Sequence, residues 1–160
     1  MSRATAKIKK LQMARIKAEA DGFGLSIEEQ VEKPWGGYLL FSNSSLPYFL
    51  NAYWRGVCPR LPKSKNSVAP KVLLVAPNAV QGKPAKLDML SLQWHSRRRE
   101  IWRVIDGPVL FFSGTSWKDL QGHVKETGDV IEIAKGEWHC LIGLENWGRV
   151  AELWVHSNRK

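Results

Sequence analysis

Residues 91–107 read SLQWHSRRREIWRVIDG, and the interpretation of the rest of the chain depends on them. Gln93 and His95 are two positions apart, so on a β-strand their side chains point to the same face. Three arginines follow, and Glu100 then opens a second run of strand-forming residues that ends at Gly107. A strand, a turn and a strand would bring an amide, an imidazole and a carboxylate together. Such mixed nitrogen and oxygen donors suit zinc, iron, manganese, cobalt or nickel.

A later stretch, GDVIEIAKGEWHCLIGLEN at 128–146, supplies a further imidazole. Gly136 allows a turn, and His139 begins the next expected strand. Taken singly, each donor has an ordinary structural explanation, such as a hydrogen-bonded histidine or a surface ion pair between Glu100 and an arginine. The joint spacing is more specific than any one residue. It predicts a metal site made of Gln93, His95, Glu100 and His139.

The rest of the chain predicts an all-β fold. The 160 residues are 44% hydrophobic, which fits one globular domain. Short runs rich in Val, Ile, Leu and aromatic residues alternate with Gly, Pro, Asn, Ser and Asp, a pattern typical of a sandwich or barrel. The expected strands are 37–42, 48–57, 71–77, 88–95, 100–107, 108–114, 129–136, 139–144 and 149–157. Irregular loops are expected at 58–70 and 77–84.

The N-terminal segment differs from the rest. Ile8, Leu11, Ala14 and Ala18 recur at helical spacing among lysines and arginines, so residues 4–20 are expected to form a helix. We divide the chain into a basic helical N-terminal extension, 1–30, and a β domain, 31–160. Because the helix has few large apolar residues, we expect the β domain to fold without residues 1–20.

The net charge of +9 favours an anionic partner. Nucleic acid is not expected, because no recognition motif accompanies the charge. Membrane binding is not expected either, because no apolar run is long enough to cross a bilayer. Cys58 and Cys140 do not form a disulfide framework or a CxxC motif. With no signal peptide of the usual build, a cytoplasmic location is expected.

The two stretches resemble the signature motifs of the cupin superfamily. More narrowly, they resemble the cupin domain of type II mannose-6-phosphate isomerases, including the form fused to mannose-1-phosphate guanylyltransferase. The resemblance covers residues 31–157 and implies a single-domain cupin, an antiparallel β jelly-roll barrel, with an N-terminal basic helix. The matching residues are Ser91, Leu92, Gln93, His95, Arg98, Glu100, Trp102, Val104 and Gly107, with an upstream element at Glu32, Lys33, Pro34, Trp35, Gly36 and Tyr38.

The resemblance implies metal-dependent aldose–ketose isomerisation of a sugar phosphate, with mannose 6-phosphate and fructose 6-phosphate as the expected pair. The ligands carried over by motif are the same four donors, and the expected cofactor is a divalent metal ion, zinc first. Arg98 is the expected catalytic residue. Glu137 and His123 are candidates for the base, and Trp35 and Trp154 are interpreted as packing. The expected substrate-binding residues are Lys33, Arg97, Trp102 and Trp138.

Several positions depart from the family pattern. Arg97 and Ile101 stand where the family has histidines, and Ala134 and Trp138 replace a proline and a lysine. The family's acidic C-terminal tail has no counterpart here, so we expect changes in the substrate pocket rather than in the metal site.

Two alternatives to the isomerase remain. One is a non-haem iron oxygenase, which uses two histidines and one carboxylate, although a fourth ligand at Gln93 counts against it. The other is a non-catalytic sugar- or metal-binding cupin. The expected partner is a phosphorylated sugar, and edge strands would allow a homodimer.

Overall fold

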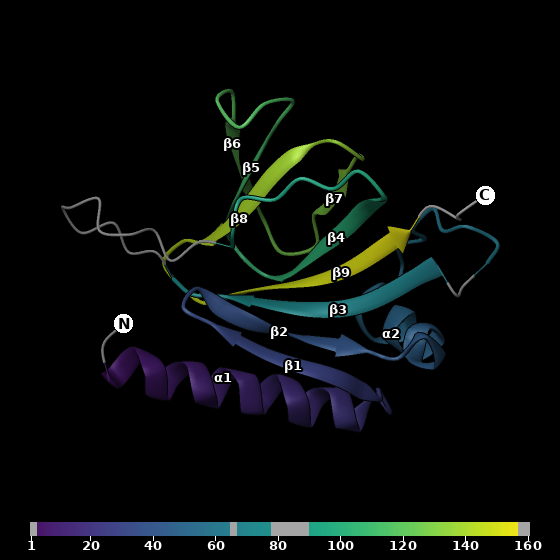
Figure 1. The fold of residues 1–160 in the computed structure, drawn as a ribbon. Helices are drawn as coiled ribbons and strands as arrows, with labels where there is room; N and C mark the ends of the chain where they lie inside the picture. Colours follow the sequence, from purple (N-terminus) through teal and green to yellow (C-terminus); the bar gives the residue numbers. More distant parts are fainter. Residues whose placement is uncertain (1–2, 65–66, 78–89, 157–160) are drawn as a thin grey trace.

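The computed structural model describes residues 3–64, 67–77 and 90–156 (Figure 1). Two α-helices and a short 3-10 helix accompany nine strands in this part of the chain. In chain order the elements are α1 (Arg3–Gly22), β1 (Ile27–Lys33), β2 (Gly36–Phe41), η1 (Asn43–Ser45), α2 (Leu46–Tyr53), β3 (Val68–Val75), β4 (Arg98–Asp106), β5 (Val109–Gly114), β6 (Gln121–Lys125), β7 (Val130–Ile133), β8 (Trp138–Gly143) and β9 (Gly148–His156).

The strands form two antiparallel sheets. The larger has the order β1-β2-β3-β9-β4-β7, and the smaller has the order β6-β5-β8. Figure 1 shows α1 running along β1 and β2, with the small sheet on the other side of the large one. Strand β9 lies inside the large sheet, paired with β3 on one side and β4 on the other. This architecture confirms the expected antiparallel β fold with an N-terminal helix.

The large sheet is buried on both faces around β4 and β9. Alternation along the strands sends Ile101 and Leu153 into a core shared with α1 and α2. Trp102 and Val150 face the other way, into a core that includes Phe111 of the small sheet. Any polar side chain on this second face is therefore enclosed between the sheets, which is where a site can be sheltered from water.

The expected strand at 48–57 is wrong, because α2 occupies most of it. Leu46, Phe49, Leu50 and Tyr53 follow the helical spacing i, i+3, i+4, i+7, and Leu46, Phe49 and Tyr53 are buried. Pro47 lies in the first turn, where its missing N–H costs no helical hydrogen bond. The strand was predicted because residues 48–57 are rich in aromatic side chains, which are common in strands.

The expected strand at 88–95 is wrong in its described part. Residues 90–95 carry only an isolated bridge, at Gln93. Positions 88–89, and most of the expected loop at 77–84, lie outside the described residues. Conversely, β1 and β6 were not predicted, because most of their side chains are exposed and polar and so lack the apolar alternation of a buried strand.

Helix α1 is docked more firmly than its composition indicates. Met13, Ile16 and Ala20 belong to the core shared with the large sheet. Arg149 of β9 donates to Glu19 over 2.8 Å and also pairs with Asp106. The expectation that the β domain folds without residues 1–20 is therefore revised.

Neither described helix has the length and apolar character needed to cross a membrane. The division at residue 30 stays a prediction.

Replacing Ile16 by alanine tests the docking of α1. Ile16 is 1% exposed, so we expect the free energy of unfolding to fall by about 2–5 kcal/mol, from lost burial and the cavity left behind. The matched control is Leu11→Ala on the same helix. Leu11 is 62% exposed, and its loss should change stability by less than about 0.5 kcal/mol. Urea unfolding measures the free energy of unfolding of both variants. A loss in Ile16→Ala no larger than that in Leu11→Ala would show that this face of α1 is not part of the core.

Candidate metal centre

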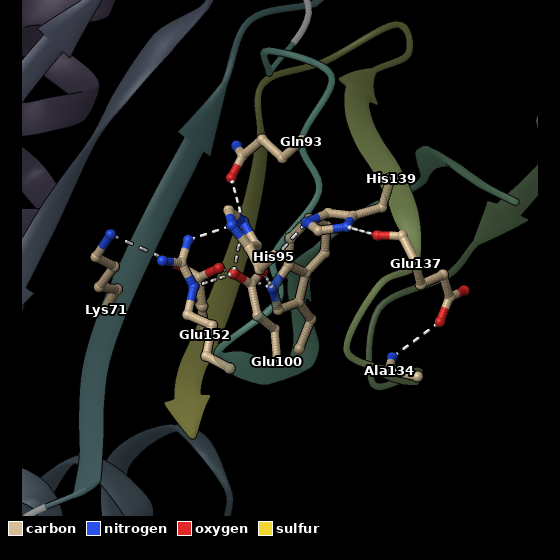
Figure 2. Close-up of polar contacts among 10 residues, drawn as sticks. Lys71, Gln93, His95, Glu100, Ala134, Glu137, His139 and Glu152 are labelled. Atoms are coloured by element: carbon tan, nitrogen blue, oxygen red, sulfur yellow. Dashed lines mark hydrogen bonds and ion pairs between the residues drawn. The ribbon is translucent and has the colours of Figure 1, made fainter. Parts of the chain in front are cut away.

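Three segments bring the four predicted donors together, as Figure 2 shows. Glu100 is on β4, His139 is on β8, and Gln93 and His95 precede β4. The backbone of Gln93 both donates to and accepts from that of His139, at 2.9 and 3.0 Å. These two bonds attach the stretch before β4 to β8, and thereby fix the position of donors that are 46 residues apart in number.

The spacing of the donor atoms fits a metal ion. His95 Nε2 lies 3.0 Å from Gln93 Oε1 and 3.2 Å from Glu100 Oε1. His139 Nε2 lies 3.4 Å from Glu100 Oε2. The candidate ligand atoms of His95, Glu100 and His139 all lie within 4.8 Å of one another. Two ligand atoms bound at right angles, each about 2.1 Å from a metal, would be about 3 Å apart.

His139 carries the clearest sign of a missing partner. Its side chain is 1% exposed, and Nε2 has no hydrogen-bond partner among the described residues. Nδ1 lies 3.0 Å from the carbonyl oxygen of Glu137, to which only a protonated Nδ1 can donate. In the tautomer that makes this bond, Nε2 carries the lone pair, and it lies 3.4 Å from Glu100 Oε2. A carbonyl that fixes the tautomer of a histidine in this way is a common support for a metal ligand.

The electrostatics keep two donors in their ligand forms. Burial lowers the pKa of His95 to about 4, with help from Arg98 and His139 and against the effect of Glu100. Burial opposes ionisation of Glu100, but its contacts with His139, Glu152 and Arg98 outweigh that effect and lower its pKa to about 2. At neutral pH the site therefore offers a neutral imidazole and a carboxylate, as metal binding requires.

Trp102 orients the carboxylate. Its indole Nε1 donates to Glu152 Oε1 over 2.9 Å and to Glu100 Oε2 over 3.2 Å. Trp102 is 0% exposed, so the structure places it behind the donors rather than in the path of a substrate. Glu152 itself is 3% exposed, and burial together with nearby Glu100 raises its pKa well above the ordinary value.

Arg98 connects the centre to its surroundings. Its Nε donates to Glu100 Oε1 over 2.9 Å, and its Nη2 lies 2.8 Å from His95 Nε2. The guanidinium carbon lies 3.8 Å from the centroid of the Trp154 ring, a stacked cation–π contact. A fixed positive group thus borders the donors on one side.

A cavity of about 300 Å³ opens beside the donors. Gln93 and Arg98 line it, so it reaches the candidate metal centre. Its lining combines three cationic side chains, three aromatic rings and one carboxylate. The residues are Lys33, Trp35, Tyr38, Lys71, Leu73, Leu90, Ser91, Gln93, Arg98, Glu152 and Trp154. Another cavity, of about 240 Å³ between the end of α2 and β4, contains none of the four donors.

The other predicted site residues are scattered. Lys33 lines the cavity, whereas Arg97 is exposed. Trp138 is half-buried, and its ring centroid lies 6.5 Å from that of exposed Trp94. Of the two candidate bases, Glu137 points away from the donors and accepts from the Ala134 backbone (Figure 2). His123 is exposed on β6, in the small sheet.

Sequence reasoning missed the charged cavity residues Lys71 and Glu152, and it interpreted Trp35 and Trp154, which also line the cavity, as packing. Lys71 and Glu152 are charged residues inside the apolar runs of β3 and β9. Enclosing a charge in such a strand costs free energy unless the charge is paired and hydrogen-bonded. That conflict is the signal that could have identified them. Trp154, interpreted as packing, instead lines the cavity between Lys71 and Arg98.

Comparison with known proteins establishes the fold and no more. No family model matches the sequence, and no curated protein matches it. Vicilin from Corylus avellana (hazelnut) is 15% identical, with a TM-score of 0.57 over 84% of this chain and 33% of that chain. A deletion mutant of Bacillus subtilis oxalate decarboxylase is 14% identical, with a TM-score of 0.56 over 82% of this chain and 28% of that chain. The chain thus spans about a third of their length, and it has the cupin fold.

Loss of one imidazole should release the metal. In His95→Ala we expect the bound metal per protein to fall to a small fraction of the wild-type value, because one of four donors is removed. The apolar core between the sheets does not depend on this half-buried side chain, so the variant should still unfold cooperatively. The control is His123→Ala, on exposed β6. Elemental analysis of the purified proteins gives the result, and unchanged metal in His95→Ala would remove this residue from the centre.

The lowered pKa of His95 predicts a pH effect on the metal-free protein. Between about pH 6.5 and about pH 4 the unfolded chain binds a proton at this histidine more readily than the folded chain does. Its contribution to stability is therefore present above pH 6.5 and lost as the pH falls toward 4.

Comparing variants isolates this contribution from those of other groups. The stability of wild type relative to His95→Gln should decrease as the pH is lowered through this window, in chelator-treated samples. The matched control is His123→Gln, because that side chain is exposed on β6 and outside the centre. Urea unfolding at several pH values measures both differences, and a flat line for His95 would contradict its assignment as a buried neutral imidazole.

Proposed function

We propose that this chain is a metal-dependent sugar-phosphate isomerase, with mannose 6-phosphate and fructose 6-phosphate as the pair that its motifs favour. One observation carries the proposal. Gln93, His95, Glu100 and His139 converge beside a cavity that Gln93 lines together with Lys33, Lys71 and Arg98. A metal centre beside a cation-lined cavity is the arrangement that an anionic sugar substrate needs.

The four converging side chains would hold the metal. Two imidazoles, a carboxylate and an amide oxygen suit zinc first, and manganese, iron, cobalt or nickel also fit such donors. A bound divalent ion would polarise the carbonyl and the neighbouring hydroxyl of the sugar. Trp102 and the Glu137 carbonyl keep the ligands in place without touching the substrate.

Arg98 is placed to stabilise negative charge on the substrate. Its hydrogen bond to Glu100 and its stacking on Trp154 fix the guanidinium at the wall of the cavity. A positively charged group held in advance does not have to reorganise when charge develops during the reaction. Arg98 is also the one of the three consecutive arginines that lines the cavity.

Isomerisation also requires a group that moves a proton between two carbons. Glu137 and His123 do not line the cavity, so they no longer serve as candidates for this step. Among the described lining residues, the titratable side chains besides Arg98 are Glu152, Lys33, Lys71 and Tyr38. The proton-transfer group of the proposed reaction belongs to this set.

An iron-dependent oxygenase is the second candidate. It is favoured by the grouping of His95, Glu100 and His139, which are two histidines and one carboxylate. Gln93 Oε1, 3.0 Å from His95 Nε2, counts against it as a fourth donor that would take a coordination position. The two candidates differ in whether oxygen is consumed.

The deciding experiment combines elemental analysis of the purified protein with a coupled assay for fructose 6-phosphate formed from mannose 6-phosphate. The isomerase predicts product formation that a chelator abolishes and added metal restores. Failure of the metal-loaded protein to form product would reject it. Oxygen uptake would support the oxygenase instead, and bound metal with neither activity would identify a binding protein.

Arg98→Lys tests the role of the guanidinium. Lysine keeps the charge but loses the planar set of donors, so we expect kcat/KM to fall by at least about tenfold, or roughly 1.4 kcal/mol of transition-state stabilisation. Metal content should stay near wild type. The control is Arg99→Lys, because Arg99 donates to the backbone carbonyl of Arg60 and does not line the cavity. Equal activity of wild type and Arg98→Lys would reject a catalytic role.

A further inference from the structure

We propose that Lys71, Arg98 and Trp154 form a subsite for the phosphate group of a phosphate monoester, at the side of the cavity next to the metal centre. The inference rests on the proposed function, because it names the part of the substrate that these residues would hold. Neither Lys71 nor Trp154 belongs to the sequence motifs that predicted the metal site. Arg98 does belong to them, so the contacts of Lys71 and Trp154 in the structure carry the assignment.

Lys71 is a buried cation with incomplete partners. Its side chain is 3% exposed, and its nearest carboxylate oxygen, on Glu152, is 3.9 Å away. That distance is an ion pair but is too long for a hydrogen bond. The ammonium lies 3.0 Å from the centroid of the Trp154 ring and 4.2 Å from that of Tyr38. Among the described residues, then, Lys71 is held by rings and by charge, while its N–H groups have no acceptor.

Trp154 has the same deficiency. Its indole Nε1 is buried and has no hydrogen-bond partner in the described part of the chain. The indole ring contacts both cations, with the Arg98 guanidinium 3.8 Å from its centroid. Buried indole N–H groups normally find an acceptor, so this group also lacks something that the described residues do not supply.

All three groups are donors. An ammonium, a guanidinium and an indole N–H donate hydrogen bonds and cannot accept them. A ligand that completes them must bring several acceptor atoms at one place. The lining also has three cationic side chains, with Lys33, against the single carboxylate of Glu152. A phosphate monoester brings three acceptor oxygens and close to two negative charges, and so meets both requirements.

The sheet separates the Lys71 end of this subsite from the metal centre, which Arg98 contacts directly. Lys71 on β3 lies opposite Glu152 on β9, and Trp154 on β9 lies opposite Glu100 on β4. Since β9 separates them, the backbones of β3 and β4 are about 10 Å apart. A sugar held with its phosphate near Lys71 can extend toward the metal ligands. Trp35 and Tyr38 supply aromatic surface along the same cavity.

The rival explanation is that Lys71 only neutralises Glu152. Calorimetric titration of the purified protein, with its metal content recorded, separates the two. The probes are mannose 6-phosphate, inorganic phosphate, mannose and mannuronate. The subsite predicts that mannose 6-phosphate binds at least about tenfold more tightly than mannose, or roughly 1.4 kcal/mol. Equal affinity for mannuronate would assign the subsite to carboxylates and overturn the phosphate assignment.

Lys71→Met should weaken mannose 6-phosphate binding by at least about tenfold while mannose binding stays the same. The matched control is Lys118→Met, because Lys118 also lies near a tryptophan, 5.2 Å from the Trp117 centroid, but outside the cavity. Should Lys71→Met fail to fold, Trp154→Phe keeps an aromatic ring but removes the indole N–H together with the five-membered half of the indole. We expect it to weaken mannose 6-phosphate binding by about fivefold, the usual worth of one hydrogen bond.

The outcomes separate the subsite from the proposed function. Phosphate binding that depends on Lys71, in a protein that forms no fructose 6-phosphate, would support the subsite and reject the isomerase. Product formation with unchanged mannose 6-phosphate affinity in Lys71→Met and Trp154→Phe would support the isomerase and overturn the subsite. A wild-type protein that binds neither mannose 6-phosphate nor inorganic phosphate would also overturn it.

Discussion

The ionised carboxylate of Glu100, 1% exposed inside the large sheet, is the constraint on which the site depends. A charge in that position is tolerated only when it is paired and hydrogen-bonded. Arg98 and Trp102 donate to it, and His95 and His139 lie 3.2 and 3.4 Å from its oxygens. Arg98 and Trp102 are held in place by these hydrogen bonds, whereas the two imidazoles present ring nitrogens beside the same carboxylate. A divalent ion bound among the three groups would complete the compensation of this buried charge.

The sequence was sufficient to predict this part of the site because it is local. Gln93, His95 and Glu100 lie within eight positions, so strand alternation and one turn bring them together. His139 is distant in the chain, and only its motif connected it with the others. Its backbone bridge to Gln93 is the structural reason for that connection. The all-β fold was predictable for a similar reason, since most buried strands carry their own apolar pattern.

The remainder of the site depends on register, which the sequence does not display. Lys71 reaches the cavity because β3 pairs with β9 so that it faces Glu152. A shift of β3 by one residue would turn Lys71 to the helix-covered face and away from Glu152. Trp154 could not be distinguished from a core residue, because its apolar ring is similar in both roles and only its unpartnered N–H differs. For β1 and β6 the missing signal was burial, and for α2 the aromatic content hid a helical period.

The two faces of β9 explain how such a polar cavity is tolerated. Ala151, Leu153 and Val155 pack under the helices, while Glu152 and Trp154 face the opposite way into the cavity. Helix α1 packs apolar side chains against one face of β9. The free energy gained by this burial offsets the cost of enclosing charged groups on the opposite face of the same strand. Well-packed hydrophobic residues in place of Lys71 and Glu152 would often be as stable or more stable than a buried ion pair. Stability alone does not account for these two residues, whereas the proposed binding of an anionic ligand beside a metal would.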